Sequence, residues 1–251
     1  MNFPDALSKA ADSHPYDLLF ATISGAHLYG FPSPDSDFDL RGAHVLPLSK
    51  VVGLEVTDET IELAEKNDQI DLDLVTHDVK KFFNMMLKKN GYVLEQLYSP
   101  LIIRTSPEHE ELKVIAKDCI TKHHHHHYSG FASTQWALFN KEEKPRVKPL
   151  LYVYRVLLTG INLMRTGVIE ADLAVLNDEF KLSHVDDLIT RKKTGAEKQY
   201  LEALDMALHE REYCRLNAQL DEAFQNSKLP EAPSARPAID DLLKRIRLKQ
   251  R

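Results

Sequence analysis

The chain has 251 residues, of which 43% are hydrophobic and 28% charged, as expected for a globular protein of one large or two small domains. Its net charge of −6 argues against generic nucleic-acid binding, and no apolar stretch is long enough to span a bilayer. The first residues do not form a signal peptide, and the two cysteines, Cys119 and Cys214, lie far apart. We therefore expect a cytoplasmic protein with reduced thiols and no membrane partner.

The first part of the chain alternates between helical and extended patterns. Apolar spacing predicts a helix over 4–12, strands over 17–24, 37–46, 60–63 and 69–75, and a helix that stops near Asn90-Gly91. Asp78 or Thr76 is the expected cap of that last helix. Alternation in 69–75 places Ile70, Leu72 and Leu74 on one face, and therefore Asp71 and Asp73 on the other.

From about residue 107 onward the pattern is helical. Helices are expected over 107–122, 128–142, 147–166, 196–226 and 236–247. A Pro-rich connector, 226–237, precedes the last of them. The expected organisation is α+β, with a catalytic domain over 1–106 and a helical domain over 107–251, although both could share one core. Residues 1–144 carry a net charge of −8 and residues 145–251 a net charge of +2.

The segment from Gly25 to Gly42 contains the residues that indicate a chemical function. A buried strand leads into a glycine turn, and Ser-Asp-x-Asp then opens the next strand. Side chains two residues apart in a strand share a face, so Asp37 and Asp39 lie about 7 Å apart at Cα. Ionised carboxylates this close repel each other, and a divalent cation between them removes the repulsion. The pattern therefore predicts metal-assisted phosphoryl or nucleotidyl transfer.

This ordered combination of strand, glycine loop, Asp37-x-Asp39 and Arg41-Gly42 resembles the signature of the DNA polymerase β-type nucleotidyltransferase superfamily. It is most similar to a branch of predicted nucleotidyltransferases, some of them associated with RNA repair pathways. The resemblance implies a small mixed sheet with flanking helices, a nucleoside triphosphate such as ATP as substrate, and Mg²⁺ or Mn²⁺ as cofactor. One position departs from the signature, because Ala26 stands where a serine is usual and Ser24 precedes the glycine.

The resemblance also implies roles for individual residues. Asp37 and Asp39 would bind both metal ions, and a third carboxylate on strand 69–75 would complete the site. Asp73 matches that context best, and Asp71 is the second choice. The residues expected to bind phosphate are Ser24, Gly25, Ala26, Gly30, Ser36, Arg41, Lys148 and Arg155.

Two of these assignments have ordinary alternatives, and a histidine run elsewhere in the chain is open to several explanations. Arg41 could instead form a salt bridge that holds the carboxylates apart. Lys148, Tyr152 and Arg155 fall on one helix stripe, which could be a solvated basic face. The run His123–His127 is best explained as a solvated helix start, with acceptor binding or a transition-metal site as alternatives.

The predicted function is Mg²⁺-dependent transfer of a nucleoside monophosphate to a hydroxyl acceptor such as RNA or tRNA. Two alternatives remain open at this point. One is a catalytically silent nucleotide- or RNA-binding protein on the same fold, to which Ala26 points. The other is a toxin–antitoxin component that modifies tRNA or a protein.

Overall fold

A computed structural model describes residues 3–66, 71–195, 200–201 and 206–249. Contacts divide the chain into two compact units. The first consists of 1–25, 37–120 and 232–251, and the second of 26–36 and 121–231. The expected division into 1–106 and 107–251 stays a proposal about domain organisation. Among the described helices, none has the length and apolar character needed to cross a membrane.

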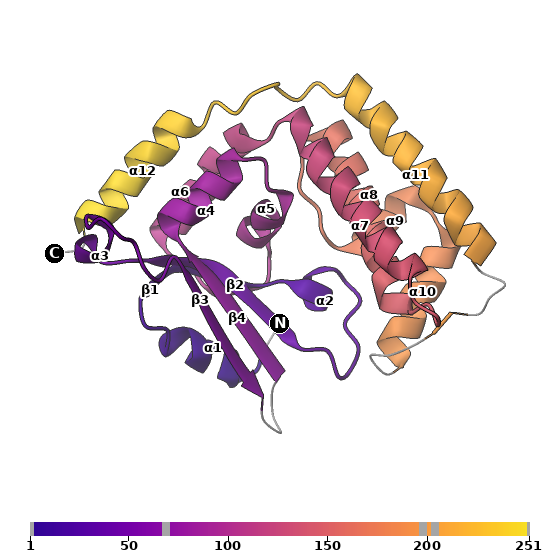
Figure 1. Ribbon diagram of the computed structural model, residues 1–251, viewed down its shortest axis with the longest axis horizontal. Coiled ribbons are helices and arrows are strands. Elements are labelled where there is room, and N and C mark those ends of the chain that lie inside the picture. Colours follow the sequence, from indigo (N-terminus) through magenta and orange to yellow (C-terminus); the bar gives the residue numbers. More distant parts are fainter. Residues whose placement is uncertain (1–2, 67–70, 196–199, 202–205, 250–251) are drawn as a thin grey trace. The chain divides into compact units, whose positions relative to one another are not determined.

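The first unit is built on a five-stranded mixed sheet (Figure 1). Its strands are β1 (Asp17–Ile23), β2 (Phe38–Val45), β3 (Thr60–Lys66), β4 (Asp71–Asp78) and β5 (Ile102–Arg104). The spatial order is β3-β4-β2-β1-β5. β2 and β4 are parallel, whereas the other neighbouring pairs are antiparallel. Strand β2 is thus central, and its residues from Leu40 to Val45 are all buried.

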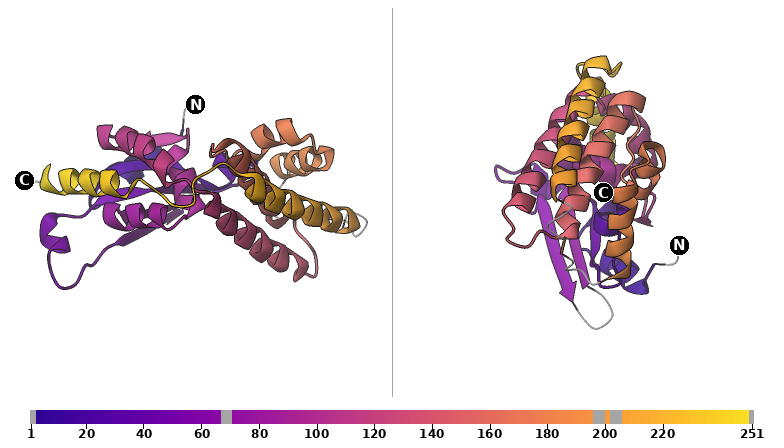
Figure 2. Two further views of the ribbon diagram at one scale, coloured as in Figure 1. Left: turned by 90° about the horizontal axis from the view of Figure 1, so that it is seen from above. Right: turned by 90° about the vertical axis from the view of Figure 1, so that its right-hand side faces the viewer.

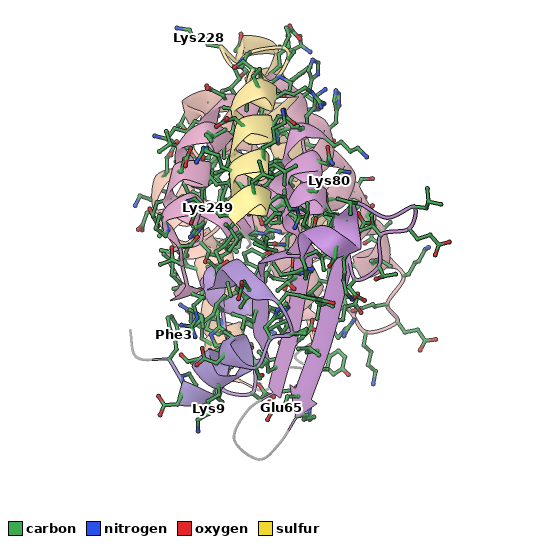
Figure 3. The ribbon with its side chains drawn as sticks, turned by 90° about the vertical axis from the view of Figure 1, so that its left-hand side faces the viewer. Phe3, Lys9, Glu65, Lys80, Lys228 and Lys249 are labelled. Carbon is green, nitrogen blue, oxygen red and sulfur yellow. The ribbon has the colours of Figure 1, made fainter. Side chains whose placement is uncertain are left out.

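Both faces of the sheet are covered. On one face Leu7 of α1 (Asp5–Asp12) packs with Ile23, Leu40 and Leu74. On the other face lie α4 (Val79–Leu87), α5 (Gly91–Tyr98) and α6 (Pro107–Ala116), with Phe20 in contact with Phe82 and stacked on His109. Strand β3 forms one edge and exposes charged side chains such as Glu65 (Figure 3), which disfavours pairing with another chain.

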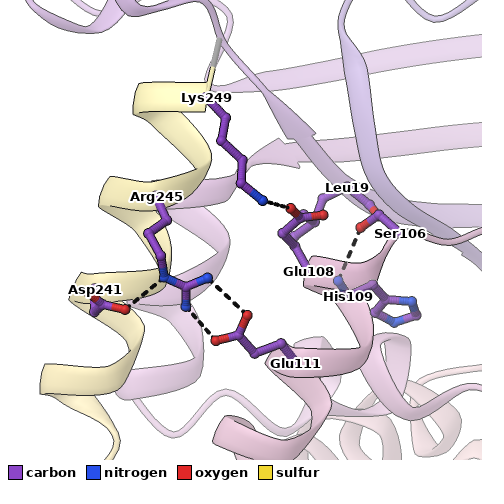
Figure 4. Close-up of polar contacts among 8 residues, drawn as sticks. All are labelled: Leu19, Ser106, Glu108, His109, Glu111, Asp241, Arg245 and Lys249. Atoms are coloured by element: carbon purple, nitrogen blue, oxygen red, sulfur yellow. Dashed lines mark hydrogen bonds and ion pairs between the residues drawn. The ribbon is translucent and has the colours of Figure 1, made fainter.

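The last helix of the chain, α12 (Arg236–Lys249), packs on α6 and α4. Its Arg247 forms a buried ion pair with Asp78, which also caps α4 by accepting from the amide of Lys80. Nearer the surface, Arg245 bridges Glu111 and Asp241, and Lys249 contacts Glu108 (Figure 4). Because exposed pairs contribute little, the contacts that hold α12 are its buried apolar residues, Ile239, Leu242 and Ile246, together with the buried Arg247–Asp78 pair.

The second unit is helical. Among its described helices are α7 (His125–Asn140), α8 (Val147–Thr166), α9 (Leu173–Phe180), α10 (Ser183–Thr194) and α11 (Met206–Asn226). Helix α8 is buried along most of its length because α7, α9, α10 and α11 all pack on it (Figure 2). The segment 26–36, which links β1 to β2 in sequence, belongs to this unit.

Most predicted elements are confirmed to within a few residues, including the helix 147–166 and the cap at Asp78. Of the predicted helix 196–226, the structure describes Met206–Asn226 as helical, whereas Tyr200 forms a β-bridge with Arg146. Residues 196–199 and 202–205 lie outside the description. Residues 69 and 70 of the predicted strand are likewise outside it. The sequence patterns did not predict β5, α9 or α10. The first two are short, and the apolar residues of α10 are only Val185, Leu188 and Ile189, too few for a clear helical period.

We expect the protein to lose stability on acidification because of buried imidazoles. Burial lowers the pKa of His44 to about 4 and that of His77 to about 4, each from a usual value of 6.5. Below pH 6.5 the unfolded chain therefore binds protons that the folded protein does not, so stability falls as the pH drops toward 4. Urea unfolding across this range measures the slope. His44→Gln should make it shallower, and an unchanged slope would contradict the assignment.

Candidate active site

Two of the three aspartates expected at the metal site, Asp39 and Asp73, lie on neighbouring parallel strands. In the register between β2 and β4, Asp39 stands opposite Asp73. Both belong to the sheet face that carries α5, since Arg41 on the same face bonds to Tyr92 of that helix. Asp37 comes immediately before β2 and is partly exposed. The structure therefore brings Asp39 and Asp73 together, and Asp37 lies two residues before Asp39 in the chain.

A single guanidinium joins the two carboxylates. Nη2 of Arg41 donates to Oδ1 of Asp39 at 2.6 Å and to Oδ2 of Asp73 at 2.7 Å. Nη1 donates to the main-chain oxygen of Asp73 at 2.6 Å, and Nε donates to the hydroxyl of Tyr92 at 3.2 Å. The sequence left two roles open for Arg41, a phosphate contact and a salt bridge to the carboxylates. The structure contains the salt bridge.

The charge on Arg41 is strongly favoured. Its side chain is only 11% exposed, and this burial by itself would lower its pKa. Tyr92, Asp39 and Asp73 outweigh the burial, and the net effect is a pKa above the usual value. The guanidinium therefore offsets the repulsion between the two carboxylates that their positions would otherwise create.

The glycine turn approaches the same carboxylate from the other side. Gly25 has a φ of +60°, and a Cβ placed on it would lie 1.7 Å from Oδ2 of Asp39. The amide of Ser24 donates to the main-chain oxygen of Asp39 at 2.8 Å. The hydroxyl of Ser24 is buried and makes no hydrogen bond within the part of the chain that the structure describes. The turn and the aspartate strand therefore form one tightly fitted feature.

Replacing Gly25 by Ala should disturb this fit. The methyl group would displace the carboxylate of Asp39 from Arg41, and the positive φ adds about 1–2 kcal/mol of strain. We expect a lower free energy of unfolding in chemical denaturation. Gly130→Ala, in α7 where the added Cβ meets nothing within 4 Å, is the control and should stabilise by up to about 1 kcal/mol. Equal effects of the two changes would contradict a close approach at Gly25.

Asp71, the second choice for the third carboxylate, is differently placed. It stands opposite Lys66 in the pairing of β3 with β4 and forms an ion pair with that lysine. The lysine side chain is 79% exposed. Asp71 thus shares a strand face with Asp73 but is paired at the sheet edge rather than with Arg41.

The remaining phosphate-binding candidates belong to the second unit. Ala26 is buried, and its main-chain oxygen accepts from the amide of Phe31. Gly30 has a φ of +81° and lies against the carboxylate of Asp172, which caps α9. The segment 26–36 is held on α8 by aromatic contacts, since Tyr152 meets the rings of Tyr29 and Phe31 edge-on.

The basic stripe on α8 is not a uniform solvated face. Arg155 is only 2% exposed, and its guanidinium lies 4.0 Å from the centre of the Tyr29 ring. Lys148, near the start of α8, is partly exposed. The explanation of the stripe as a solvent-facing surface is therefore wrong for Arg155, because the chain from Ala26 to Ser36 covers it.

The histidine run does begin a helix, but the expectation that it is solvated is wrong for two of its members. His124 and His125 are buried. His125 bonds to Asp221 at 2.8 Å, and His123 bonds to Glu231 at 2.9 Å. Acidic partners and the ring of Phe224 thus anchor the start of α7, and no transition-metal cluster is present among the residues that the structure describes.

The donor chemistry at Asp39 and Asp73 fits a divalent cation. Two carboxylates from adjacent strands already converge on one positive group, and carboxylate oxygens are the ligands that Mg²⁺ and Mn²⁺ prefer. Within the described residues, no three acidic, histidine or cysteine side chains are yet gathered closely enough to hold a metal ion. Asp37, two residues before Asp39, is the residue that would complete such a set.

A mixed sheet that places a glycine turn and paired aspartates together is the architecture of a polymerase β-like nucleotidyltransferase. The comparison with known families agrees: the model of the RNA repair pathway DNA polymerase beta family (RlaP) matches residues 2–245. The chain therefore belongs to this family. The resemblance inferred from the glycine loop and Asp37-x-Asp39 is thereby confirmed.

Two relatives match most of the chain. The Uncharacterized protein MJ0002 of Methanocaldococcus jannaschii is 31% identical over 227 residues, covering 86% of this chain and 88% of its own length. The Uncharacterized protein YcgL of Bacillus subtilis is 26% identical over 217 residues, covering 82% and 81%. A solved nucleotidyltransferase-like protein from Exiguobacterium sibiricum matches with 12% identity and a TM-score of 0.32, over 98% of this chain and 74% of that one.

Proposed function

We propose that this protein transfers a nucleoside monophosphate from a nucleoside triphosphate to a hydroxyl group of an RNA acceptor, tRNA included, with Mg²⁺ or Mn²⁺ as cofactor. One observation carries the proposal: Asp39 and Asp73 converge from adjacent strands on a single positive group. Family membership supports the nucleotidyl transfer, and the mildly basic second half of the chain supports a polyanionic acceptor.

In this proposal Asp37, Asp39 and Asp73 hold the cation, which would lower the pKa of the acceptor hydroxyl and neutralise the leaving pyrophosphate. Asp73, whose side chain is 46% exposed, is accessible to an acceptor and takes up the hydroxyl proton on a carboxylate oxygen. The acceptor oxygen then bonds to the α-phosphorus, and the bond from that phosphorus to pyrophosphate breaks.

The phosphate contacts are assigned by position around the glycine turn and, for the basic side chains, by exposure. Gly25, Ala26 and Gly30 contribute main-chain groups of the turn, with Ser24 and Ser36 at its two ends. Lys148 is accessible enough to meet a phosphate or the acceptor directly. The ring of Tyr29 covers Arg155, and through this contact Arg155 supports the segment that contains the glycine turn. Arg41 neutralises the carboxylates and, once a cation takes over that role, serves the phosphates as a bidentate donor.

The test is incubation with each of the four α-labelled nucleoside triphosphates, Mg²⁺ and either total RNA or a cell lysate. Label should enter RNA with at least one of them, and Asp39→Asn should remove it. Label that enters a protein fraction would favour a toxin–antitoxin role. If no label is transferred but a nucleotide still binds, the silent binding protein suggested by Ala26 would replace the proposal.

A further inference from the structure

A cavity lies between α4 and α12, two helices of the first unit that pack against each other. Its volume is about 340 Å³, which is within the range of sites that bind small molecules. Side chains of these two helices alone line it, so neither Asp39 nor Asp73 takes part. The cavity is therefore a feature of the first unit that the proposed reaction does not use.

The floor of the cavity is apolar. Phe83 of α4 and Ile239 of α12 line it and are only 1% and 3% exposed, so they form its deepest part. Leu87 and Leu243 also line it and are half-buried. An apolar floor of this kind favours a ligand with a flat or apolar body, because binding removes that surface from water.

The exposed part of the lining carries two cations. Lys80 (Figure 3) and Arg236 line the cavity, and neither side chain has an acidic partner in the part of the chain that the structure describes. Arg245, farther along α12, is by contrast held by two carboxylates. Asp240 also lines the cavity, but its ion pair with Lys244 offsets its charge. The lining therefore favours an anion.

Asn84 supplies the remaining polar group of the lining. Its side chain is exposed and makes no hydrogen bond within the described ranges. A side-chain amide can both accept from N6 and donate to N7 of adenine, whereas lysine and arginine bind phosphate. We propose that this groove binds an adenine nucleotide, with the ring on the apolar floor, its edge at Asn84 and its phosphate at Lys80 and Arg236.

The inference goes beyond the proposed function, because it needs no chemistry at the paired carboxylates. The experiment measures binding of adenosine monophosphate to the full-length protein by calorimetry, with a chelator present so that no divalent cation supports binding there. Lys80→Met and Arg236→Met should each weaken binding by about 10-fold, the effect of losing one charge-assisted hydrogen bond. Asn84→Trp keeps both cations, fills the groove from an exposed position, and should abolish binding.

Lys9→Met is the matched control, because Lys9 is an exposed lysine on α1, which covers the other face of the sheet (Figure 3). It should leave the affinity unchanged. An equal loss in this variant would show non-specific attraction and overturn the inference, as would wild-type affinity in all three groove variants or a lack of saturable binding at millimolar nucleotide. Circular dichroism checks that each variant is folded.

A second probe, a short fluorescein-labelled oligoadenylate, identifies the source of the nucleotide. Tighter binding of the oligonucleotide assigns the groove to an RNA strand, and tighter binding of adenosine monophosphate assigns it to a free nucleotide. Guanosine monophosphate should bind more weakly, because guanine presents two acceptors where adenine presents an acceptor and a donor. Equal affinity for the two monophosphates would overturn the role of Asn84 and the choice of adenine.

Discussion

Asp73→Asn is expected to lower the rate of nucleotide transfer by about 10²- to 10⁴-fold, the range associated with loss of a positioned acid–base group. The reason is that Asp73 stands opposite Asp39 in the strand register and is accessible to an acceptor. The fold should remain intact because Asn has the same shape. Single-turnover transfer of label at saturating nucleotide, with circular dichroism for folding, measures both properties.

Asp71→Asn is the matched control for this change. It removes a carboxylate from the same strand and the same sheet face, but one that pairs with Lys66 at the sheet edge. Transfer should fall by less than about threefold, since exposed ion pairs contribute little energy. If Asp71→Asn were the more damaging change, the third carboxylate would be on the predicted strand but at the other residue.

Arg41→Met is expected to have the largest effect on stability near the site. The change leaves Asp39 and Asp73 facing each other without their shared counter-charge. Removing one partner of a buried ion pair typically destabilises by about 3–5 kcal/mol. Because the side chain of Asp73 is 46% exposed, we expect the lower part of that range. Urea unfolding in the presence of a chelator measures this loss.

A divalent cation should reverse much of this loss. Mn²⁺ or Mg²⁺ can replace the missing positive charge, so either ion should raise the unfolding midpoint of Arg41→Met more than that of the wild type. Arg41→Lys keeps the charge but cannot bridge both carboxylates through a planar fork, and should therefore lie between the two. If the metal stabilised wild type and Arg41→Met equally, Arg41 and the cation would not share a site.

Local sequence carries enough information for most of the elements and for the pattern of the segment from Gly25 to Gly42. A continuous apolar run predicts β1, and alternation predicts β4, which presents one face to the core. The glycine turn and Asp37-x-Asp39 lie within one short stretch, so their proximity follows from chain connectivity. The same stretch also supports the family, which the match over residues 2–245 confirms.

Tertiary structure alone decides how distant segments meet. The register between β2 and β4 depends on packing across the sheet, and it is this register that sets Asp73, rather than Asp71, opposite Asp39. The same register brings both carboxylates within hydrogen-bond distance of Arg41. The spacing of residues along one strand does not determine this contact. Likewise, Arg155 and Lys192 look like surface cations in sequence. They are buried because the segment 26–36 folds onto the helices that carry them, a contact that no local periodicity encodes.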